Sequence, residues 1–281
     1  APEARGLADD VALLGDIVLT HDQMVEGVHF FASADPADVA WKLVARNLSD
    51  LAAKGAEPLG ALLGYSLSDA AWDARFADGL AAAFAQMGGA LWGGDTSRAP
   101  AMPHGRVGMR SFGMTMVGRA SHLPLPARSG ARVGDALWLA GSIGGAHAGF
   151  VALTNDGDAT GAAVDALLRP RPLLAAGRAI APLAHAMMDV SDGLLLDAQR
   201  MAEASGVGIN ISTAALPLHP DALDADAAMR WGDDYALLFA LPTGVEPPVN
   251  AQRIGDILGQ SDAALLIDGQ PVAPGNLGWE H

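Results

Sequence analysis

The chain has 281 residues, enough for two domains of roughly 100 to 150 residues or for one large domain. Hydrophobic residues make up 51% and charged residues 17%, a composition typical of compact globular proteins rather than disordered ones. The formal net charge of −15 argues against a nucleic-acid partner, because binding that polymer needs clustered lysine and arginine. No apolar run reaches the roughly 18 to 20 residues of a membrane span, so we expect no membrane partner either.

Cysteine is absent, which excludes disulfides, thiolate metal sites and cysteine nucleophiles and favours a cytoplasmic location. The segment that starts at Ala1 lacks the pattern of a secretion signal. Ala1 is not a start methionine, and a motif-rich stretch follows it closely at residues 6–14. We therefore expect that further residues precede Ala1 in the natural protein.

The first half of the chain predicts two helices among short strands. One helix starts at Asp35-Pro36, which supplies an N-cap and a proline at the first helical position, and it ends at Gly55. The other spans residues 69–87 and is stopped by Gly88 and the glycine after it. Strands are expected at residues 11–14, 17–20, 25–31, 58–68, 90–92 and 107–117.

Glycine, proline and polar residues recur between residues 118 and 135, which indicates a domain boundary. We predict an N-terminal domain at residues 1–122 and a C-terminal domain at residues 123–281. In the second half, strands are expected at 136–140, 186–190, 207–211 and 235–241, and helices at 144–154, 172–183 and 193–205. The fold class is α+β.

The predicted helix that ends at Gly55 is apolar on nearly every side and should be buried. Asn47 and Asp50 would then enter a region of low dielectric constant. A buried carboxylate costs several kcal/mol unless a cation meets it. Two interpretations remain open: Arg46 or another arginine neutralises Asp50, or a metal ion does.

Other acidic groups lie at the ends of predicted strands. Any one of them is typical of a helix cap or a turn. Together they describe a Mg²⁺–nucleotide site, because Mg²⁺ takes a few carboxylates plus substrate phosphates. The acidic groups are Asp9-Asp10, Asp22, Asp95, Asp189 and Asp192.

Phosphorylated reactants are anionic, so they can approach clustered aspartates only if divalent ions screen the repulsion. The common phosphate-binding loop is excluded, because it needs Gly-Lys and the two lysines are Lys42 and Lys54. The glycine-rich stretches at residues 93–94 and 141–145 remain candidates for backbone N–H contacts with phosphate.

These motifs resemble the thiamine-monophosphate kinase family in order and spacing, over nearly the whole chain. The matching stretches are GLADDVALL (6–14), THDQMVEGVHF (20–30), NLSDLAAKGA (47–56), GGDT (93–96), RSGARVGD (128–135), VSDGL (190–194), GDDYALLF (232–239) and the ending GWEH (278–281).

The resemblance implies ATP- and Mg²⁺-dependent conversion of thiamine monophosphate to thiamine diphosphate, with several bound ions. It also implies the two-domain fold of aminoimidazole-ribonucleotide synthetase, with mixed sheets and flanking helices. In that fold, residues 1–122 would bind ATP and Mg²⁺ and form a homodimer through the N-terminal domains, and residues 123–281 would complete the nucleotide and substrate site. The alternatives are another ATP-dependent synthetase of the same superfamily and a non-catalytic relative that binds Mg²⁺–nucleotide. Because the acceptor is itself a phosphate, we predict direct in-line transfer without a phosphoenzyme.

The resemblance also assigns residues. The implied metal ligands are Asp10, Thr20, Asp22, Asp50, Asp95, Asp189 and Asp192. The implied nucleotide contacts are Gly94, Asp95, Arg128 and Ser191, and the implied substrate contacts are His29, Asp233 and Trp279. Of these, the catalytic set is Asp50, Asp95, Arg128 and Asp192.

Several of these residues also have an ordinary structural interpretation. His29 could be a hydrogen-bonded strand histidine, Trp279 could cover a core edge, Arg128 could belong to a linker, and Ser191 could cap a helix. A tryptophan face at 279 also suits a cationic ligand through cation–π attraction of about 0.5 to 2 kcal/mol.

Four positions depart from the pattern of the family. Ala8 stands where glycine is usual, His21 where threonine is usual, Gly145 where aspartate is common, and Asp233 where glutamate is usual. The shorter carboxylate at Asp233 makes substrate contact there less secure, and His21 is expected to weaken one metal site.

Overall fold

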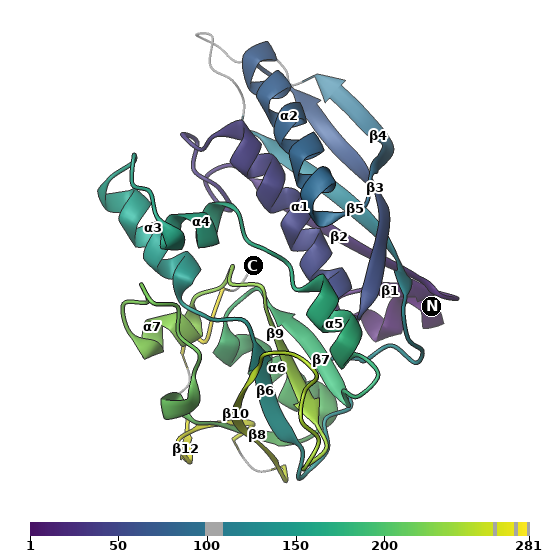
Figure 1. The fold of residues 1–281 in the computed structure, drawn as a ribbon, viewed down its shortest axis with the longest axis vertical. Helices are drawn as coiled ribbons and strands as arrows, with labels where there is room; N and C mark the ends of the chain where they lie inside the picture. The colour runs from purple at the N-terminus through teal and green to yellow at the C-terminus, as the bar shows by residue number, and fades with distance from the viewer. Residues whose placement is uncertain (99–108, 261–262, 273–274, 280–281) are drawn as a thin grey trace.

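The computed structural model describes residues 1–98, 109–260, 263–272 and 275–279, and it contains two mixed sheets (Figure 1). The first sheet has the strand order β1-β2-β5-β3-β4. All its neighbours are antiparallel except β3 and β4, which are parallel. Its strands are β1 (Ala12–Leu14), β2 (Ile17–Val25), β3 (Ala56–Leu67), β4 (Leu91–Arg98) and β5 (Ser111–Ala120).

The second sheet has the order β12-β11-β8-β10-β6-β9-β7, and in it β11 and β8 are parallel. Its strands are β6 (Ala136–Ala140), β7 (Ala186–Val190), β8 (Gly208–Ile211), β9 (Ala236–Leu241), β10 (Gln252–Leu258), β11 (Leu265–Ile267) and β12 (Gln270–Pro271). Strands β6, β7 and β9 are buried along their whole length, as expected of continuous apolar runs.

Helices α1 (Pro36–Ala53) and α2 (Ala70–Met87) lie side by side against one face of the first sheet (Figure 1). Each begins at an aspartate whose carboxylate accepts a backbone N–H of the first turn: Asp35 from Ala37, and Asp69 from Trp72. The remaining helices are η1 (Pro2–Leu7), α3 (Gly145–Asn155), α4 (Ala162–Leu168), α5 (Leu174–Ile180), α6 (Leu194–Ser205), η3 (Thr213–Ala215) and α7 (Ala225–Arg230).

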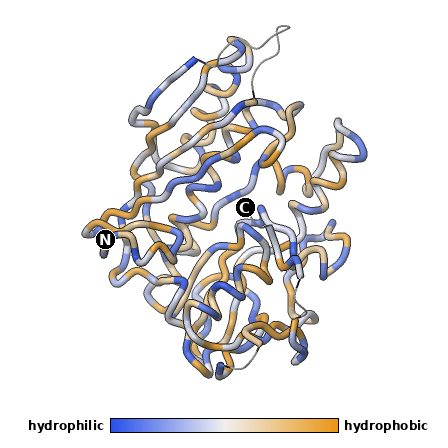
Figure 2. Tube along the Cα trace, turned by 180° about the vertical axis from the view of Figure 1, so that it is seen from behind, coloured by the Kyte–Doolittle hydropathy of each residue, from blue (hydrophilic) through white to orange (hydrophobic). Residues whose placement is uncertain are grey.

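Helix α1 is buried on several sides because it packs against both halves of the molecule. Leu43 and Leu48 belong to the core of the first sheet, whereas Ala52 and Ala53 join a cluster with Phe239 of the second sheet. Hydrophobic segments occur inside both halves in Figure 2, in keeping with a separate apolar core for each sheet. The helix therefore carries its polar residues into the junction between the halves.

The other face of the first sheet is open. Leu62 on β3 is 47% exposed and Trp92 on β4 is 56% exposed, and every residue of β4 is exposed. In the parts of the chain that the structure describes, no helix has both the length and the apolar run that crossing a membrane requires.

The predicted α+β class with mixed sheets and flanking helices is confirmed, and so are the two long helices. Three elements were expected to be shorter or different. Strand β2 continues to Val25, and residues 26–31 then form a turn at Gly27 in place of a strand. Strand β4 includes the GGDT motif, which was expected to follow a strand, because that segment pairs in parallel with β3. Asp22 and Asp95 therefore lie inside strands, not at their ends.

The predicted boundary between residues 122 and 123 falls between β5, which ends at Ala120, and β6, which begins at Ala136. Its position stays a prediction. The expected strand at 107–117 began at residues outside the described part, and β5 accounts for the rest. The sequence did not predict α4, α7, β10, β11 or β12, which are short or lie in the region of mixed polarity after residue 220.

Candidate active site

A group of aspartates meets where α1 faces β2 and β7. Asp50 on α1 accepts a hydrogen bond from the Thr20 hydroxyl of β2. Burial, and then the charges of Asp22, Asp189 and Asp10, raise the pKa of the Asp50 carboxyl well above its usual range. Within the described residues, no lysine, arginine or histidine forms an ion pair with Asp50, because Arg46 pairs with Asp22 instead. Arg46 nevertheless lies near enough for its charge to interact with that of Asp50, so neutralisation of Asp50 by a metal ion stays a prediction.

Two neighbours of Asp50 are similarly short of positive charge. Burial, followed by the charge of Asp10, raises the pKa of Asp189 to about 7, although the Ser49 hydroxyl donates to Asp189 Oδ2 at 2.6 Å. Burial also raises the pKa of Asp22, and its ion pair with Arg46 Nη2, at 3.5 Å, only partly opposes this. Asp22, Asp50 and Asp189 are called the acidic cluster below.

The adjacent Asp9 and Asp10 differ because the fold supplies them with cations. The ammonium of Lys54, whose side chain is 0% exposed, lies 2.6 Å from Asp9 and 2.7 Å from Asp10. Arg128 forms a further ion pair with Asp10. Burial alone would raise the pKa of Asp10, but Lys54 and Arg128 outweigh it and hold that pKa below its usual value.

The loop after β7 is held in place by a residue of α6. The carboxylate of Asp197 accepts the backbone N–H groups of Ser191 and Asp192, each at 3.1 Å. Arg200 donates to Asp197 at 3.0 Å and pairs with Asp192. The hydrogen bonds to Asp197 hold the backbone of the loop that carries Ser191 and Asp192.

Ser191 does not cap α6, because the N-cap is Gly193 and no side chain caps it.

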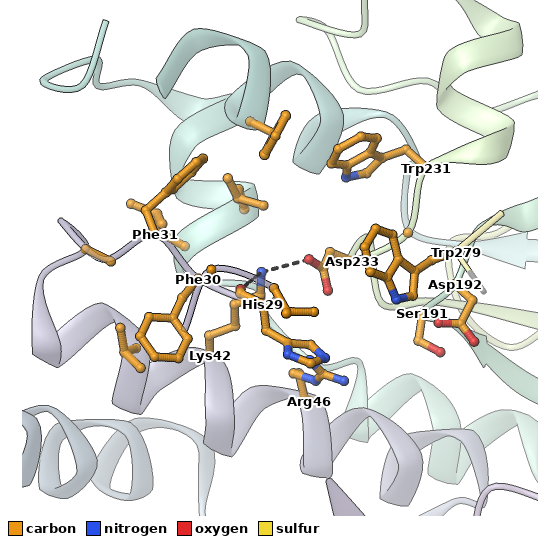
Figure 3. A pocket seen from close by; sticks show the side chains of 18 of the residues that line it. His29, Phe30, Phe31, Lys42, Arg46, Ser191, Asp192, Trp231, Asp233 and Trp279 are labelled. Atoms are coloured by element: carbon orange, nitrogen blue, oxygen red, sulfur yellow. Dashed lines mark hydrogen bonds and ion pairs between the residues drawn. The ribbon is translucent and has the colours of Figure 1, made fainter. Parts of the chain in front are cut away.

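A cavity of about 400 Å³ lies beside the acidic cluster, between α1 and the C-terminal segment (Figure 3). Lys42 of α1 donates to Asp233 Oδ2 at 2.7 Å and to the His29 carbonyl at 3.3 Å. Asp233 also accepts from the Tyr235 hydroxyl at 2.7 Å, and its φ of 65° turns the chain there. His29, Asp233 and Trp279, the three residues that the resemblance assigns to substrate contact, all line this cavity.

His29 lies in the turn after β2, not in a strand. Its Nδ1 accepts the backbone N–H of Val25 at 3.0 Å, which leaves the proton of the neutral ring on Nε2. Burial, and then the charge of Arg46, lowers the pKa of His29 to about 4. The imidazole is therefore neutral at physiological pH.

Aromatic rings form one wall of the cavity. Phe31 stacks on Phe150 with 5.4 Å between ring centroids, and Phe150 lies 4.7 Å from Trp231. Trp279, 50% exposed, faces this wall from the C-terminal segment, and its backbone N–H donates to Asp192 at 2.8 Å (Figure 3). The cavity thus has an aromatic side for an organic group and a charged side toward α1.

The acidic cluster fits a Mg²⁺ site by its chemistry. Its oxygen donors suit a hard cation, and burial beside other carboxylates raises the pKa of Asp50, so the ionised form of Asp50 needs further positive charge nearby. In the portion of the chain that is described, no three His, Asp or Glu side chains are already arranged around a common ion position. This does not conflict with Mg²⁺, which is usually bound by one or two carboxylates together with substrate phosphates.

Comparison with known proteins bears on what this arrangement does. Residues 8–120 match the family model for the N-terminal domain of AIR synthase related protein, and residues 132–260 match the one for its C-terminal domain. The thiamine-monophosphate kinase of Escherichia coli strain K12 is 34% identical, over 98% of this chain and 91% of its own length. That of Caulobacter vibrioides is 35% identical, over 100% of this chain and 86% of its own. The chain belongs to the thiamine-monophosphate kinase family.

A solved structure agrees with this membership. AaThiL complexed with AMPPCP and TMP superimposes with a TM-score of 0.87 and 28% identity, covering 98% of this chain and 94% of that one. The two-domain AIR-synthase-like fold that the resemblance implied is thereby confirmed. A second structure, the thiamine monophosphate kinase of Aquifex aeolicus, superimposes with a TM-score of 0.84 and 28% identity, covering 96% of each chain.

Within one chain, most of the residues that the resemblance assigns lie together, and two do not. Asp10, Thr20, Asp22, Asp50, Asp189 and Arg128 surround one another, with Ser191 and Asp192 on the adjoining loop. Gly94 and Asp95 lie on the exposed edge strand β4, and the Asp95 carboxylate forms no hydrogen bond or ion pair with side chains of the other described residues. Glu280 and His281 of the GWEH ending lie outside the described residues.

The glycine-rich stretch at 141–145 contacts a carboxylate of its own chain. The N–H groups of Gly144 and Ala146 donate to the carboxylate of Asp234, at 2.8 and 3.2 Å. A side chain at Gly145 would lie 3.0 Å from the His219 ring, so the aspartate common in the family would displace His219. In this conformation Gly144 therefore donates to Asp234 and not outward, and phosphate contacts by this stretch stay a prediction.

Two further departures have a structural setting. His21 is exposed on β2 and its Nδ1 lies 2.9 Å from the Thr115 hydroxyl, on the open side of the sheet. Ala8 is exposed beside η1, and nothing in the structure explains its exchange for glycine.

Sequence reasoning missed several residues of the site. Lys42 and Lys54 were noted only as the two lysines, and Asp197, Arg200 and Trp231 were not considered. A signal existed for the lysines: both lie on or next to a helix predicted to be buried, where an ammonium needs acidic partners. For Trp231 and Phe150 no local signal existed, because Phe150 meets Phe31 and Trp231 only in the folded chain.

Proposed function

We propose that the protein transfers the γ-phosphoryl group of ATP to thiamine monophosphate, giving thiamine diphosphate. The observation that carries this proposal is the cavity beside the acidic cluster, in a member of this kinase family. One side of the cavity offers aromatic rings to an organic acceptor, and the other adjoins carboxylates without counterions. Such a pair of sites suits an anionic acceptor that meets a metal-bound nucleotide.

The residues have distinct roles in this proposal. The substrate contacts are His29, Asp233 and Trp279. Asp233 is held by Lys42 and Tyr235, so the carboxylate is presented in a fixed direction. Ser191 and Arg128 contact the nucleotide, and the loop that carries Ser191 is oriented by Asp197. The acceptor phosphate is ionised, so transfer is direct and in line, without a general base or a phosphoenzyme.

Mg²⁺ belongs to the proposal as the ion that screens the phosphates when it is bound. Asp22, Asp50 and Asp189 would hold it, together with Thr20 and Asp192. Asp10 is a weaker candidate, because Lys54 and Arg128 already neutralise it. Several ions are proposed, since one Mg²⁺ carries two positive charges, fewer than the three carboxylates of the acidic cluster and the phosphates of two reactants together.

A homodimer through the N-terminal domains is also part of the proposal. The open face of the first sheet carries exposed Leu62 and Trp92, and β4 offers a free edge. Gly94 and Asp95, which lie apart from the other assigned residues, are on that strand, so a second copy would bring them near a site. We further propose a cytoplasmic location, in keeping with a chain that has no cysteine.

The test is turnover. The protein is incubated with ATP, Mg²⁺ and thiamine monophosphate, and thiamine diphosphate and ADP are measured by chromatography. We expect equal amounts of both products, and none when Mg²⁺ is chelated. Rapid quenching should trap no phosphorylated protein, and finding one would overturn direct transfer. ATP binding without product would indicate a non-catalytic relative instead.

A further inference from the structure

One arginine lies at the boundary between the cavity and the acidic cluster. Lys42, Arg46 and Asp50 follow one another at intervals of four residues on α1, so they share one face of the helix at successive turns. Lys42 and Arg46 line the cavity, and Asp50 belongs to the cluster. Arg46 is therefore where an acceptor in the cavity comes closest to the carboxylates.

The hydrogen-bonding capacity of Arg46 is largely unused. Its side chain is 13% exposed, and its ion pair within the described residues is a single 3.5 Å contact with Asp22. The buried Nε has no hydrogen-bond partner. A guanidinium has five N–H donors in a planar fork that matches two oxygens of a phosphate or carboxylate. Arg46 therefore has N–H groups that could donate to a bound ligand.

Lys42, the other cation that α1 contributes to the cavity, already has hydrogen-bond partners. Its ammonium is 2.7 Å from Asp233 and 3.3 Å from the His29 carbonyl. In Figure 3 the Arg46 guanidinium lies beside the His29 ring, and Ser191 and Asp192 lie across the cavity from it. Asp192 and Asp233 also line the cavity, and of the two cations from α1, Arg46 is the one whose ion pair is with a residue outside the lining, Asp22.

We propose that Arg46 binds the phosphate of the acceptor and makes the site select a phosphorylated over an unphosphorylated acceptor. This rests on the proposed function. Two parallel N–H donations from the guanidinium would offset the repulsion from Asp22 and Asp192 and hold the remaining phosphate oxygen toward the acidic cluster. Arg46 makes and breaks no bond in the reaction, so it is a substrate-binding residue that determines specificity.

The test compares two ligands that differ by the phosphate. Binding of thiamine monophosphate and of thiamine is measured by calorimetry, without ATP, for the wild type, Arg46→Met and Arg110→Met. Arg110 is a matched control, because its side chain is also 13% exposed and it pairs with Glu26 in the first sheet, outside the cavity. We expect Arg46→Met to bind the monophosphate about 10- to 100-fold more weakly, the range of a charge-assisted pair. Its affinity for thiamine should stay close to that of the wild type, and Arg110→Met should change neither.

The outcomes separate this inference from the proposed function. Equal losses for both ligands, or no loss for either, would overturn the role of Arg46 while the wild type still binds and phosphorylates thiamine monophosphate. A wild type that binds both ligands equally would also overturn it. A wild type that does not bind thiamine monophosphate would refute the proposed function itself. If Arg46→Met does not fold, Arg46→Gln is measured in its place and the same outcomes decide.

Discussion

Asp10 and Asp50 are neighbouring aspartates with opposite electrostatic settings. Burial acts on both, yet the pKa of Asp10 is held below its usual value and that of Asp50 is raised well above it. Lys54 and Arg128 account for the first, and the charges of other aspartates account for the second. The fold thus neutralises its acids on one side with its own cations. On the other side it leaves charge that only a bound cation can balance.

The comparison predicts first that Asp50 is needed for function and not for folding. We expect Asp50→Asn to lower the rate of transfer at least about 1000-fold, because a lost metal ligand removes several kcal/mol of transition-state stabilisation. The ligand-free variant should melt no lower than the wild type at neutral pH, since an unfavourable charge is gone. Turnover and thermal melting measure the two effects. Asp16→Asn, at an exposed pair on β1–β2, is the control, and a rate like that of the wild type in Asp50→Asn would return this residue to a structural role.

Around Asp9 and Asp10, where the fold supplies its own cations, we expect Lys54 to be needed for stability. Lys54→Met leaves the carboxylates of Asp9 and Asp10 short of positive charge, and breaking a buried pair costs about 3–5 kcal/mol. Chemical denaturation with and without Mg²⁺ measures this. If Lys54 neutralises these carboxylates as a bound metal ion would neutralise the acidic cluster, Mg²⁺ should raise the stability of the variant more than that of the wild type. An unchanged unfolding midpoint would show that the two carboxylates need no cation.

Asp234 tests whether backbone N–H groups can replace a cation. It has no ion pair among the described residues, and burial raises its pKa to about 7 although Gly144 and Ala146 donate to it. A folded-state pKa above the unfolded value of 3.8 means that stability is lost as pH rises from there through about 7. Relative to Asp234→Asn, the wild type should therefore lose stability over this window. Unfolding at several pH values checks the slope, and parallel curves would contradict it.

The smallest effect is expected for an exposed pair. Arg75 and Asp35 form an ion pair at the start of α1, but the Arg75 side chain is 59% exposed and water screens the charges. Arg75→Ala should leave the melting temperature within the scatter of repeated scans. A clear drop would mean that exposure is a poor guide to which ion pairs matter in this molecule.

Local sequence patterns predicted the elements with strong signals. Asp35-Pro36 and Asp69 start the two long helices because their caps act within one turn, and the apolar runs at residues 136–140 and 186–190 are buried strands. Strand β4 was predicted too short, because two glycines usually end a strand. Here Gly94 lies so close to β3 that an added Cβ would be 1.9 Å from the Leu63 carbonyl oxygen. That requirement comes from the neighbouring strand and is invisible in the local sequence.

The acidic residues show the same division. Their number and motifs indicated a metal-dependent phosphoryl-transfer site, and the fold brings six of the seven assigned metal ligands together, all but Asp95. The pattern did not tell which carboxylates are already neutralised. Lys54 is one residue past the end of α1. It pairs with Asp9 and Asp10 only because the fold brings the N-terminal segment next to the end of this helix.

The sequence by itself determined the family, the α+β class and the identity of most acids at the site. Helix caps, apolar runs and ordered motifs are local, so no distant contact is needed to detect them. Tertiary structure alone decided which charges are paired, where the cavity lies, and that Arg46 stands between the cavity and the cluster with donors to spare. Those properties depend on distances between residues far apart in the chain, and electrostatic free energies change steeply with such distances and with burial.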